Sequence, residues 1–250
     1  MNALSARHYV LSVKLRREKV PSFDVYPFTL PVVRHLDELE LHPAVTFLVG
    51  ENGSGKSTLL EAIAVAWGFN AEGGTKNFHF QTRGSHSNLH ESLRLIKSVQ
   101  RPRDGFFLRA ESLFNVATEI ENLGVIDSYG GVSLHEQSHG ESFFAVMNER
   151  FGGHGFYVLD EPEAALSPTR QLAMLVRMHE LVKQRSQFIV ATHSPMLMAY
   201  PDAWIYQITP AGLHRVALEE TEHYIVAKRF LNDTQRQLSA LLDDPQGSLL

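Results

Sequence analysis

The chain of 250 residues contains no cysteine. Disulfide bonds, thiolate metal ligands and a cysteine nucleophile are therefore excluded. The chain also has no run of about 18 apolar residues, so we expect no membrane insertion. Residues 1–7 lack the apolar core of a signal peptide, and we expect a cytoplasmic protein.

Basic residues are not in excess either. The 23 Lys and Arg residues stand against 28 Asp and Glu residues, which gives a formal net charge of −5. This balance does not support DNA as a partner, although a local basic patch would not be visible in a sum over the whole chain. The hydrophobic content of 44% is ordinary for a globular protein. We expect residues 1–250 to form one α/β domain.

One stretch organises the chain: Gly50-Glu-Asn-Gly-Ser-Gly-Lys-Ser-Thr58 fits the phosphate-binding pattern G-x-x-x-x-G-K-[ST]. Residues 44–49 before it read as a buried strand, and residues 59–67 after it read as a helix. Glycines let the backbone turn tightly and point N–H groups at an anion, beside the positive end of the helix. The lysine is expected to reach the β- and γ-phosphates of ATP, and the serine after it to bind Mg²⁺. The predicted nucleotide-binding residues of this loop are Gly50, Asn52, Gly53, Ser54, Gly55, Lys56, Ser57 and Thr58.

Polar side chains follow two further apolar strands. Residues 156–159 lead into Asp160 and Glu161, and residues 187–192 lead into His193. In an open α/β sheet, the carboxyl ends of the strands face the ligand crevice. Two adjacent acids at that edge suit Mg²⁺ binding and water activation, and a histidine there is more plausibly functional than structural.

The sequence Ser138-His-Gly-Glu141 fits the capping box at the start of a helix. A helix N-terminus beside a glycine offers a second anion site. The alternative is a plain helix start without a ligand, and the spacing alone does not decide between the two.

Hydrophobic periodicity predicts the remaining elements. A final amphipathic helix is expected over residues 219–242, packed on the sheet rather than forming a surface that binds a partner. Further strands are expected at residues 9–15, 28–33, 36–41, 106–108, 204–208 and 213–216, and further helices at residues 89–99, 111–123 and 168–183.

Three aromatic residues precede the phosphate-binding loop: Phe23, Tyr26 and Phe28. An adenine ring could stack on one of them. Core packing is the alternative, and the sequence does not choose among the three.

Four motifs, in this order, resemble those of the ABC-type ATPase domain. The glycine loop resembles its Walker A motif, including Asn52. Residues 137–141, Gln-Ser-His-Gly-Glu, resemble a degenerate form of its Leu-Ser-Gly-Gly-Gln signature. Residues 156–161 resemble its Walker B motif, and residues 192–195, Thr-His-Ser-Pro, its histidine switch. The resemblance implies a P-loop NTPase fold, namely an ABC-ATPase-like head with an N-terminal antiparallel β subdomain and a mostly parallel core sheet flanked by helices.

Residues 160–168, Asp-Glu-Pro-Glu-Ala-Ala-Leu-Ser-Pro, narrow the resemblance to the RecF-like and SMC-like soluble ATPases and their small relatives. Residues 105–118 look typical of one such group of small predicted ATPases. These proteins serve DNA repair, chromosome maintenance or anti-phage defence. The insertion at about residues 70–137 leaves no room for coiled-coil arms, so we expect a head alone.

The resemblance also assigns roles. ATP would bridge two copies of the chain head to tail, and hydrolysis would release this homodimer as a switch for a protein partner such as a nuclease or toxin. Ser57, Asp160 and Gln81 would organise Mg²⁺. The catalytic residues would be Glu161, which orients and polarises the attacking water, and His193, which contacts the γ-phosphate.

The signature carries the main departures from the family pattern. Ser138 and Gly140 of the second copy would complete the site. However, His139 replaces a glycine of the signature and Glu141 replaces its glutamine, while Ser167 replaces the usual aspartate of the D-loop. These departures concern the catalytic rate more than nucleotide binding.

Other functions remain open. An ABC transporter subunit is disfavoured by the short insertion, whereas a weakly hydrolysing, nucleotide-gated interaction module is favoured by His139. A third alternative is a zinc peptidase, since residues 135–139 fit H-E-x-x-H, with His135 and His139 as ligands, Glu136 as base and Glu161 as third ligand. The capping box starts its helix at Ser138, which leaves His135 outside the helix and disfavours zinc.

Overall fold

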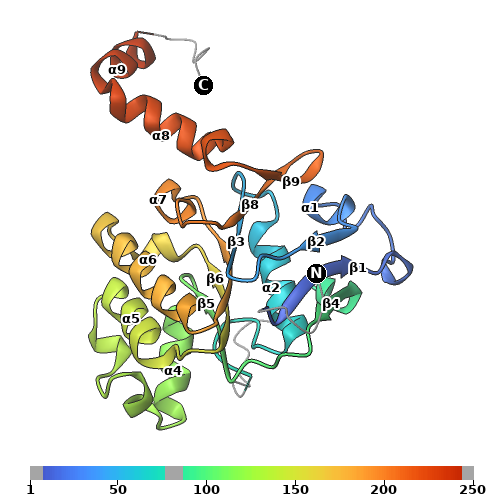
Figure 1. The fold of residues 1–250 in the computed structure, drawn as a ribbon, viewed down its shortest axis with the longest axis vertical. Helices are drawn as coiled ribbons and strands as arrows, with labels where there is room; N and C mark the ends of the chain where they lie inside the picture. The colour runs from blue at the N-terminus through green and yellow to red at the C-terminus, as the bar shows by residue number, and fades with distance from the viewer. Residues whose placement is uncertain (1–7, 77–86, 244–250) are drawn as a thin grey trace.

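A computed structural model describes residues 8–76 and 87–243 of the chain. In this part the strands form two sheets, and helices cover both faces of the larger sheet (Figure 1). Gln81 lies outside the described residues, so its place at the metal site stays a prediction.

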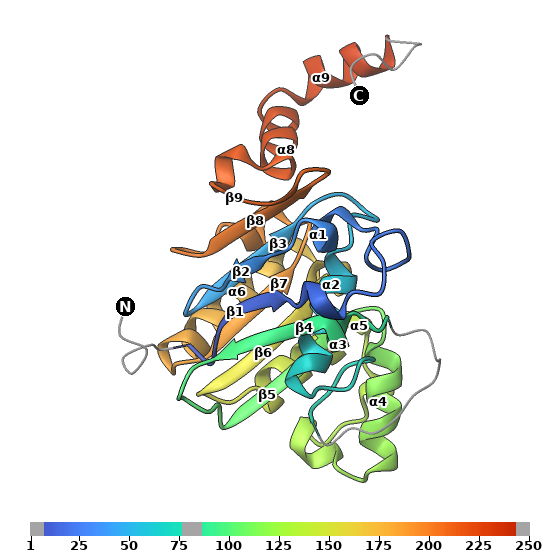
Figure 2. The same ribbon diagram turned by 90° about the vertical axis from the view of Figure 1, so that its right-hand side faces the viewer.

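The larger sheet contains the strand that leads into the phosphate-binding loop. Its strands are β3 (Val45–Val49), β5 (Asp104–Arg109), β6 (Gly155–Asp160), β7 (Gln187–Ala191), β8 (Trp204–Thr209) and β9 (Gly212–Val216). They lie in the order β5-β6-β7-β3-β8-β9, and all neighbours are parallel except the β8–β9 hairpin (Figure 2). The carboxyl ends of β3, β6 and β7 therefore lie at one edge of the sheet.

The smaller sheet is antiparallel and has the strand order β2-β1-β4: β2 (Glu38–Glu40), β1 (Val10–Leu15) and β4 (Leu93–Lys97). The buried side chain of Gln187 ties it to the larger sheet. The amide oxygen accepts from the N–H groups of Tyr9 at 2.9 Å and Val10 at 3.0 Å. The amide nitrogen donates to the carbonyls of Val10 at 2.8 Å and His42 at 3.0 Å, so the amide uses all of its usual hydrogen-bonding capacity.

Two apolar clusters lie on opposite faces of the larger sheet. One face is covered by α2 (Lys56–Trp67), α1 (Pro31–Arg34) and the smaller sheet. The other face is covered by α4 (Leu113–Asn122), α5 (His139–Ala145), α6 (Pro168–Lys183) and α7 (Pro195–Met198) (Figure 1). This arrangement confirms the predicted α/β class, with a mostly parallel sheet between helices and a small antiparallel sheet.

The last two helices project from the β9 end of the molecule (Figures 1 and 2). They are α8 (Glu222–Asn232) and α9 (Thr234–Leu242), and neither contains a buried residue. The prediction of one helix packed on the sheet was therefore wrong, because β9 is an edge strand and the chain leaves the sheet after it. Within residues 8–76 and 87–243, no helix combines the length and apolar character needed to cross a bilayer.

Two other predicted elements were wrong. Residues 28–33 were expected as a strand, but Pro31 begins α1, where its missing N–H group has no consequence. Residues 89–99 were expected as a helix, but only one turn forms, α3 (Leu89–Ser92), before β4 pairs with β1. This pairing with a distant strand buries Leu93 and overrides the local pattern. The other predicted strands and helices are confirmed, with small shifts at their ends.

Candidate nucleotide site

The phosphate-binding loop connects β3 to α2 at the carboxyl edge of the larger sheet. Gly53 and Gly55 have φ angles of +79° and +95°, in the left-handed region that favours glycine. A Cβ atom on Gly55 would lie 2.7 Å from Cγ1 of Val32. The glycine at position 55 therefore serves both the turn of the loop and its close contact with α1.

Lys56 is the first residue of α2, and it is only 3% exposed. Its ammonium group donates hydrogen bonds to the carbonyl oxygens of Gly50 at 2.8 Å and Glu51 at 2.9 Å. Burial lowers the pKa of Lys56, and nearby carboxylates, first among them Glu161, oppose this shift. A positive charge thus lies inside the loop, next to the N-terminus of a helix, as an anion site requires.

Ser57 and Asp160 meet at the ends of α2 and β6. The Ser57 hydroxyl donates to Oδ1 of Asp160 at 3.0 Å. On the other side of this carboxylate, Nε of Arg109 lies 3.1 Å from Oδ2 of Asp160, and Nη1 lies 2.9 Å from Oε2 of Glu61. Hydroxyl and carboxylate oxygens are ligands that Mg²⁺ prefers. The ion pair with Arg109 shows that the carboxylate of Asp160 lies where a positive charge can contact it. The donor set therefore fits a divalent cation.

The electrostatics of Asp160 agree with this fit. Burial raises the pKa of Asp160 to about 6, while the charge of Arg109 and the hydrogen bond from Ser57 act in the opposite direction. A carboxylate whose charged form is disfavoured by burial is stabilised by a cation placed against it. The sequence predicted Asp160 and Ser57 at this place but missed Arg109, which directly follows a predicted strand.

Glu161 has an unusual backbone conformation for a residue with a side chain, with φ 48° and ψ 52°. This turn brings Oε1 of Glu161 to 3.5 Å from Nε2 of His193, which follows the neighbouring strand β7. Glu163 fixes the loop that follows β7 and carries His193 (residues 192–194, the histidine loop). Its carboxylate accepts from the His193 N–H at 2.5 Å and from the Thr192 hydroxyl at 2.7 Å. Lys56, Asp160, Glu161 and His193 are therefore brought together at one edge of the sheet.

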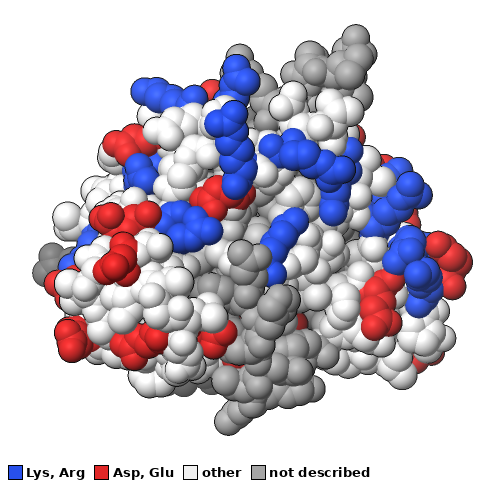
Figure 3. All heavy atoms as spheres, turned by 90° about the horizontal axis from the view of Figure 1, so that it is seen from below, with Lys and Arg blue, Asp and Glu red and all other residues white. Residues whose placement is uncertain are grey.

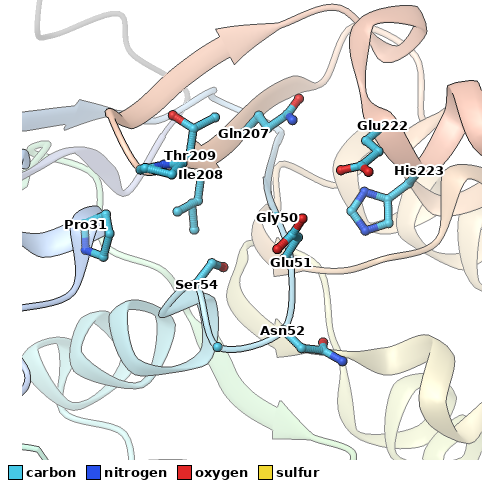
Figure 4. A pocket seen from close by; sticks show the side chains of 12 residues that line it. Pro31, Gly50, Glu51, Asn52, Ser54, Gln207, Ile208, Thr209, Glu222 and His223 are labelled. Atoms are coloured by element: carbon cyan, nitrogen blue, oxygen red, sulfur yellow. The ribbon is translucent and has the colours of Figure 1, made fainter. Parts of the chain in front are cut away.

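A second histidine, which the sequence analysis missed, contacts the first. Nε2 of His223 lies 3.0 Å from Nδ1 of His193. His223 also lines a hollow of about 400 Å³ between residues 50–54, the end of β8 at residues 207–210 and the start of α8. Figure 4 shows Glu222 and His223 on the side of this hollow near Gly50. No local pattern could have found His223, since it lies in α8, which follows the β8–β9 hairpin and is 30 residues from His193 in the sequence.

The helix that carries the signature residues begins as predicted. Ser138 precedes α5, and both its N–H group and its hydroxyl donate to Oε2 of Glu141, at 3.0 and 2.5 Å. A Cβ atom on Gly140 would lie 2.8 Å from the carbonyl oxygen of Ala165, in the turn after β6. Gly140 is therefore needed for the packing of α5 on the Walker B turn within one chain.

His139 lies near the predicted metal-binding residues of its own chain. It lines a hollow of about 270 Å³ beside Asp160, together with the residues that follow β5. These residues extend the set beyond the predicted motifs, and Glu111 brings a further carboxylate to the same hollow. The lining residues are Ser57, Arg109, Ala110, Glu111, His139, Asp160, Glu161 and Ala164.

The geometry does not fit the zinc-peptidase alternative. His135 lies in a 3₁₀ helix (Leu134–Glu136), whereas His139 is the first residue of α5, so the two imidazoles do not share a helical face. Nε2 of His135 lies 3.1 Å from the Thr118 hydroxyl, and its ring packs on Phe114. In the described ranges, no group of three His, Cys, Asp or Glu residues is arranged to hold a metal ion by itself.

The three candidate aromatic residues differ in their environments. Phe28 is buried in the apolar cluster around α2, and Phe23 packs under the guanidinium group of Arg17. Tyr26 is 64% exposed, and its hydroxyl lies 3.3 Å from the Thr58 hydroxyl at the start of α2. Of the three, Tyr26 has a ring that is open to a ligand beside the phosphate-binding loop.

Comparisons with known proteins find matches to parts of the chain. Residues 25–116 match the family model of an AAA domain. A stretch of 57 residues is 44% identical to the chromosome partition protein Smc of Mycolicibacterium paratuberculosis; it covers 23% of this chain and 5% of that relative.

Solved structures similar to this chain include the following two. The SMC head domain from Thermotoga maritima is 20% identical, with 72% of this chain and 92% of that chain covered and a TM-score of 0.40. The cbiO1 protein from Clostridium perfringens, part of the ABC transporter complex cbiONQ, is 16% identical, with 94% and 99% covered and a TM-score of 0.47. The AAA domain match and the Smc match agree with the resemblance derived from the motifs: the chain is similar to RecF/SMC-like P-loop ATPases.

Proposed function

We propose that this protein binds and hydrolyses Mg·ATP as a head-to-tail homodimer and acts as a nucleotide-driven switch. The observation that carries the proposal is the convergence of five side chains at the ends of three parallel strands. Lys56 and Ser57 follow β3, Asp160 ends β6 and Glu161 follows it, and His193 follows β7. Each of the five has the chemistry that one part of a phosphoryl transfer site needs.

The binding step uses the loop and the start of α2. Lys56 exchanges the carbonyl oxygens of Gly50 and Glu51 for the β- and γ-phosphates, and the loop N–H groups point to the same anion. Ser57 and Asp160 would hold Mg²⁺, which neutralises phosphate charge when bound. Gln81 stays a predicted third contributor, and Glu111 reaches the same hollow from the end of β5.

The hydrolytic step uses the acid and the histidine at the neighbouring strand ends. Glu161, held by its left-handed backbone, orients and polarises the attacking water. Nε2 of His193 is buried and makes no hydrogen bond within the described residues, so it has a donor position to offer to the γ-phosphate. Removal of either side chain is expected to lower kcat more than it lowers ATP affinity.

The second copy would complete the site with the N-terminus of α5. Ser138 and the Gly140 backbone would approach the γ-phosphate from the partner, as the family resemblance implies. Such an interface makes dimerisation depend on bound ATP, and hydrolysis then reverses it. Because His139 lies near Asp160 of its own chain, a weakly hydrolysing interaction module is the second candidate, and His139→Gly is expected to raise turnover in that case.

The proposed function is tested by trapping the ATP-bound state. Glu161→Gln keeps the size and hydrogen bonding of the side chain but removes the negative charge that polarises water. We expect this variant to elute as a dimer in gel filtration with Mg·ATP and as a monomer without it. Lys56→Ala serves as the matched control, because it should stay monomeric under both conditions. A Glu161→Gln protein that binds ATP and remains monomeric would contradict the proposal.

DNA is proposed as a partner on the basis of a separate local feature. Lys76 and Lys97 each place their ammonium group 4.5 Å from the centre of the Trp67 ring. Burial and neighbouring cations lower the pKa of both lysines. They line a hollow of about 230 Å³, whose carboxylate, Asp104, is already bound by Arg150 at 2.6 Å. The basic residues of this hollow are Lys76, Lys97, Arg101, Arg103 and Arg150.

Figure 3 shows the face on the β5 side of the sheet, where Lys and Arg side chains lie across the upper and middle parts and many Asp and Glu side chains lie to the left and right. We expect labelled duplex DNA to bind in fluorescence anisotropy with a strong dependence on salt. The double variant Lys97→Gln/Arg101→Gln should weaken binding about tenfold or more and reduce the salt slope by roughly 2. Lys14→Gln, which removes a cation paired with Glu38 at 2.7 Å, is the control. Equal DNA binding by the unchanged protein, the double variant and Lys14→Gln would exclude this patch as the DNA-binding surface.

A further inference from the structure

The base of α8 reaches the nucleotide site through one side chain. α8 buries none of its residues, but His223, its second residue, lies against His193 with a ring-centroid distance of 5.1 Å. The position of His223 is fixed by the residue that caps α8. Thr221 is fully buried, and its hydroxyl donates to the Leu218 carbonyl at 2.7 Å and accepts from the Tyr224 N–H at 3.4 Å. Buried Thr221 therefore fixes the start of α8, and with it the contact between His223 and His193.

The carboxylate of Glu161 determines which ring nitrogen of His193 carries the proton. Nδ1 of His193 and Nε2 of His223 are 3.0 Å apart, so one of them must donate and the other accept. On the opposite edge of the ring, Nε2 of His193 lies 3.5 Å from Oε1 of Glu161. A bare Nε2 would set a lone pair against a carboxylate, whereas an Nε2–H group is attracted to it. The favoured arrangement therefore has the proton of His193 on Nε2, with Nδ1 accepting from His223.

The surroundings favour two neutral rings. Burial is the main cause that lowers the pKa of both histidines, and the positive charge of Lys56 acts in the same direction on each. Glu161 opposes the shift at His193, and Glu222 and Glu163 oppose it at His223. In a neutral pair, the hydrogen bond at one nitrogen sets the tautomer of the whole ring.

We propose that His223 is a positioning residue that holds His193 as the Nε2–H tautomer and thereby links the α8–α9 arm to the nucleotide site. The proposal rests on the proposed function, in which Nε2 of His193 donates to the γ-phosphate. Without a donor at His223, nothing would keep Nδ1 of His193 unprotonated. Part of the His193 population would then carry its proton on Nδ1 and not on Nε2. The same contact would transmit nucleotide binding to α8, since a shift of the His193 ring would move its hydrogen bond with His223.

The test combines kinetics with a direct measurement of the tautomer. In protein labelled with ¹⁵N-histidine, the His193 signals, assigned with a His193→Asn variant, should show a protonated Nε2 and an unprotonated Nδ1. His223→Leu removes the donor and should move both His193 signals toward a tautomer mixture. It should also lower kcat roughly 10-fold or more, as loss of an orienting partner does elsewhere, with little change in the KM for ATP. His223→Gln keeps an N–H donor and should recover part of both effects.

Two controls separate this proposal from its premise. His214→Leu changes an exposed histidine of β9 and should leave the His193 signals and kcat unchanged. If the protein has no ATPase activity at all, the proposed function fails, but the nitrogen signals still test the tautomer. Unchanged His193 signals in folded His223→Leu would overturn the proposal, as would unchanged kcat in an active enzyme. An equal loss in His223→Leu and His223→Gln would also overturn it, because a merely structural role predicts that result.

Discussion

Arg109 links Asp160, the acid proposed to bind the metal, to the rest of the fold, and its removal should have a large effect on stability. Its side chain is 19% exposed and lies 3.1 Å from Asp160, whose side chain is 4% exposed. It also reaches Glu61 on α2 at 2.9 Å. Replacement by glutamine removes the positive charge while retaining some hydrogen bonding, so the main consequence is a buried carboxylate at Asp160 that has lost its cation.

The magnitude follows from the distances and the burial. At an effective dielectric constant of about 20, unit charges about 3 Å apart attract by roughly 5 kcal/mol. Removing one partner of a buried pair typically costs about 3–5 kcal/mol, and the retained hydrogen bonding lowers this figure. We therefore expect Arg109→Gln to lower the free energy of unfolding by about 2–4 kcal/mol at pH 8. For a chain of this size, that corresponds to a decrease in Tm of roughly 4–16 °C.

Thermal unfolding followed by circular dichroism measures this decrease. Arg170→Gln is the matched control, since Arg170 pairs with Glu141 at 3.6 Å on the surface, where side chains are 37% and 55% exposed. Exposed pairs are worth about 0–1 kcal/mol, so the control should change Tm only slightly. Saturating Mg·ATP should reduce the deficit of Arg109→Gln, because a cation at Asp160 replaces the lost guanidinium. Equal Tm values for the two variants would refute this account of the site.

Three further outcomes are expected. Tyr26→Ala should weaken binding of a fluorescent ATP analogue by about 1–3 kcal/mol if adenine stacks on this ring, while Phe23→Ala should not. Gln187→Leu should lower the free energy of unfolding in urea by about 3 kcal/mol or more, because it leaves two N–H groups and two carbonyls without their partner. The lowered pKa values of His193 and His223 mean that these two groups take up protons first in the unfolded chain, so their contribution to stability is full above about pH 6.5 and falls as pH decreases. His223→Leu should lose less Tm between pH 8 and pH 5.5 than the unchanged protein; an equal loss would contradict this reading.

The parallel core of the fold was predictable because its signals are local. Residues 156–160 and 187–191 are short apolar runs that end in polar side chains, and each proved to be a fully buried strand of the larger sheet. Glycine spacing and the helix that follows it were enough to locate the phosphate-binding loop. Residues 93–97 show the opposite case, since their short apolar sequence is compatible with a helix until pairing with β1 is known.

The candidate site residues that the sequence predicted follow from the same reasoning, and the residues that it missed share a different property. Asp160 ends β6, Glu161 directly follows it, and His193 lies just after β7, so the rule that ligands bind at the carboxyl ends of strands applies to them. Glu163 acts through the histidine loop of another strand, and His223 belongs to a helix beyond the hairpin. Their roles depend on contacts across 30 residues of sequence, which no local pattern encodes.

The contacts within the site suit the proposed binding of a nucleotide and the transmission of that binding to other elements. Lys56 is held by loop carbonyls and Asp160 by Arg109, so Mg·ATP, bound as proposed, would exchange these contacts for its own. Each exchange acts on a group that belongs to another element. Arg109 stands at the end of β5, directly before α4, and His193 is hydrogen-bonded to the base of α8. Binding of a γ-phosphate would therefore act on the helical face of the sheet and on the projecting arm at once, and these are the two surfaces from which a partner could sense the nucleotide.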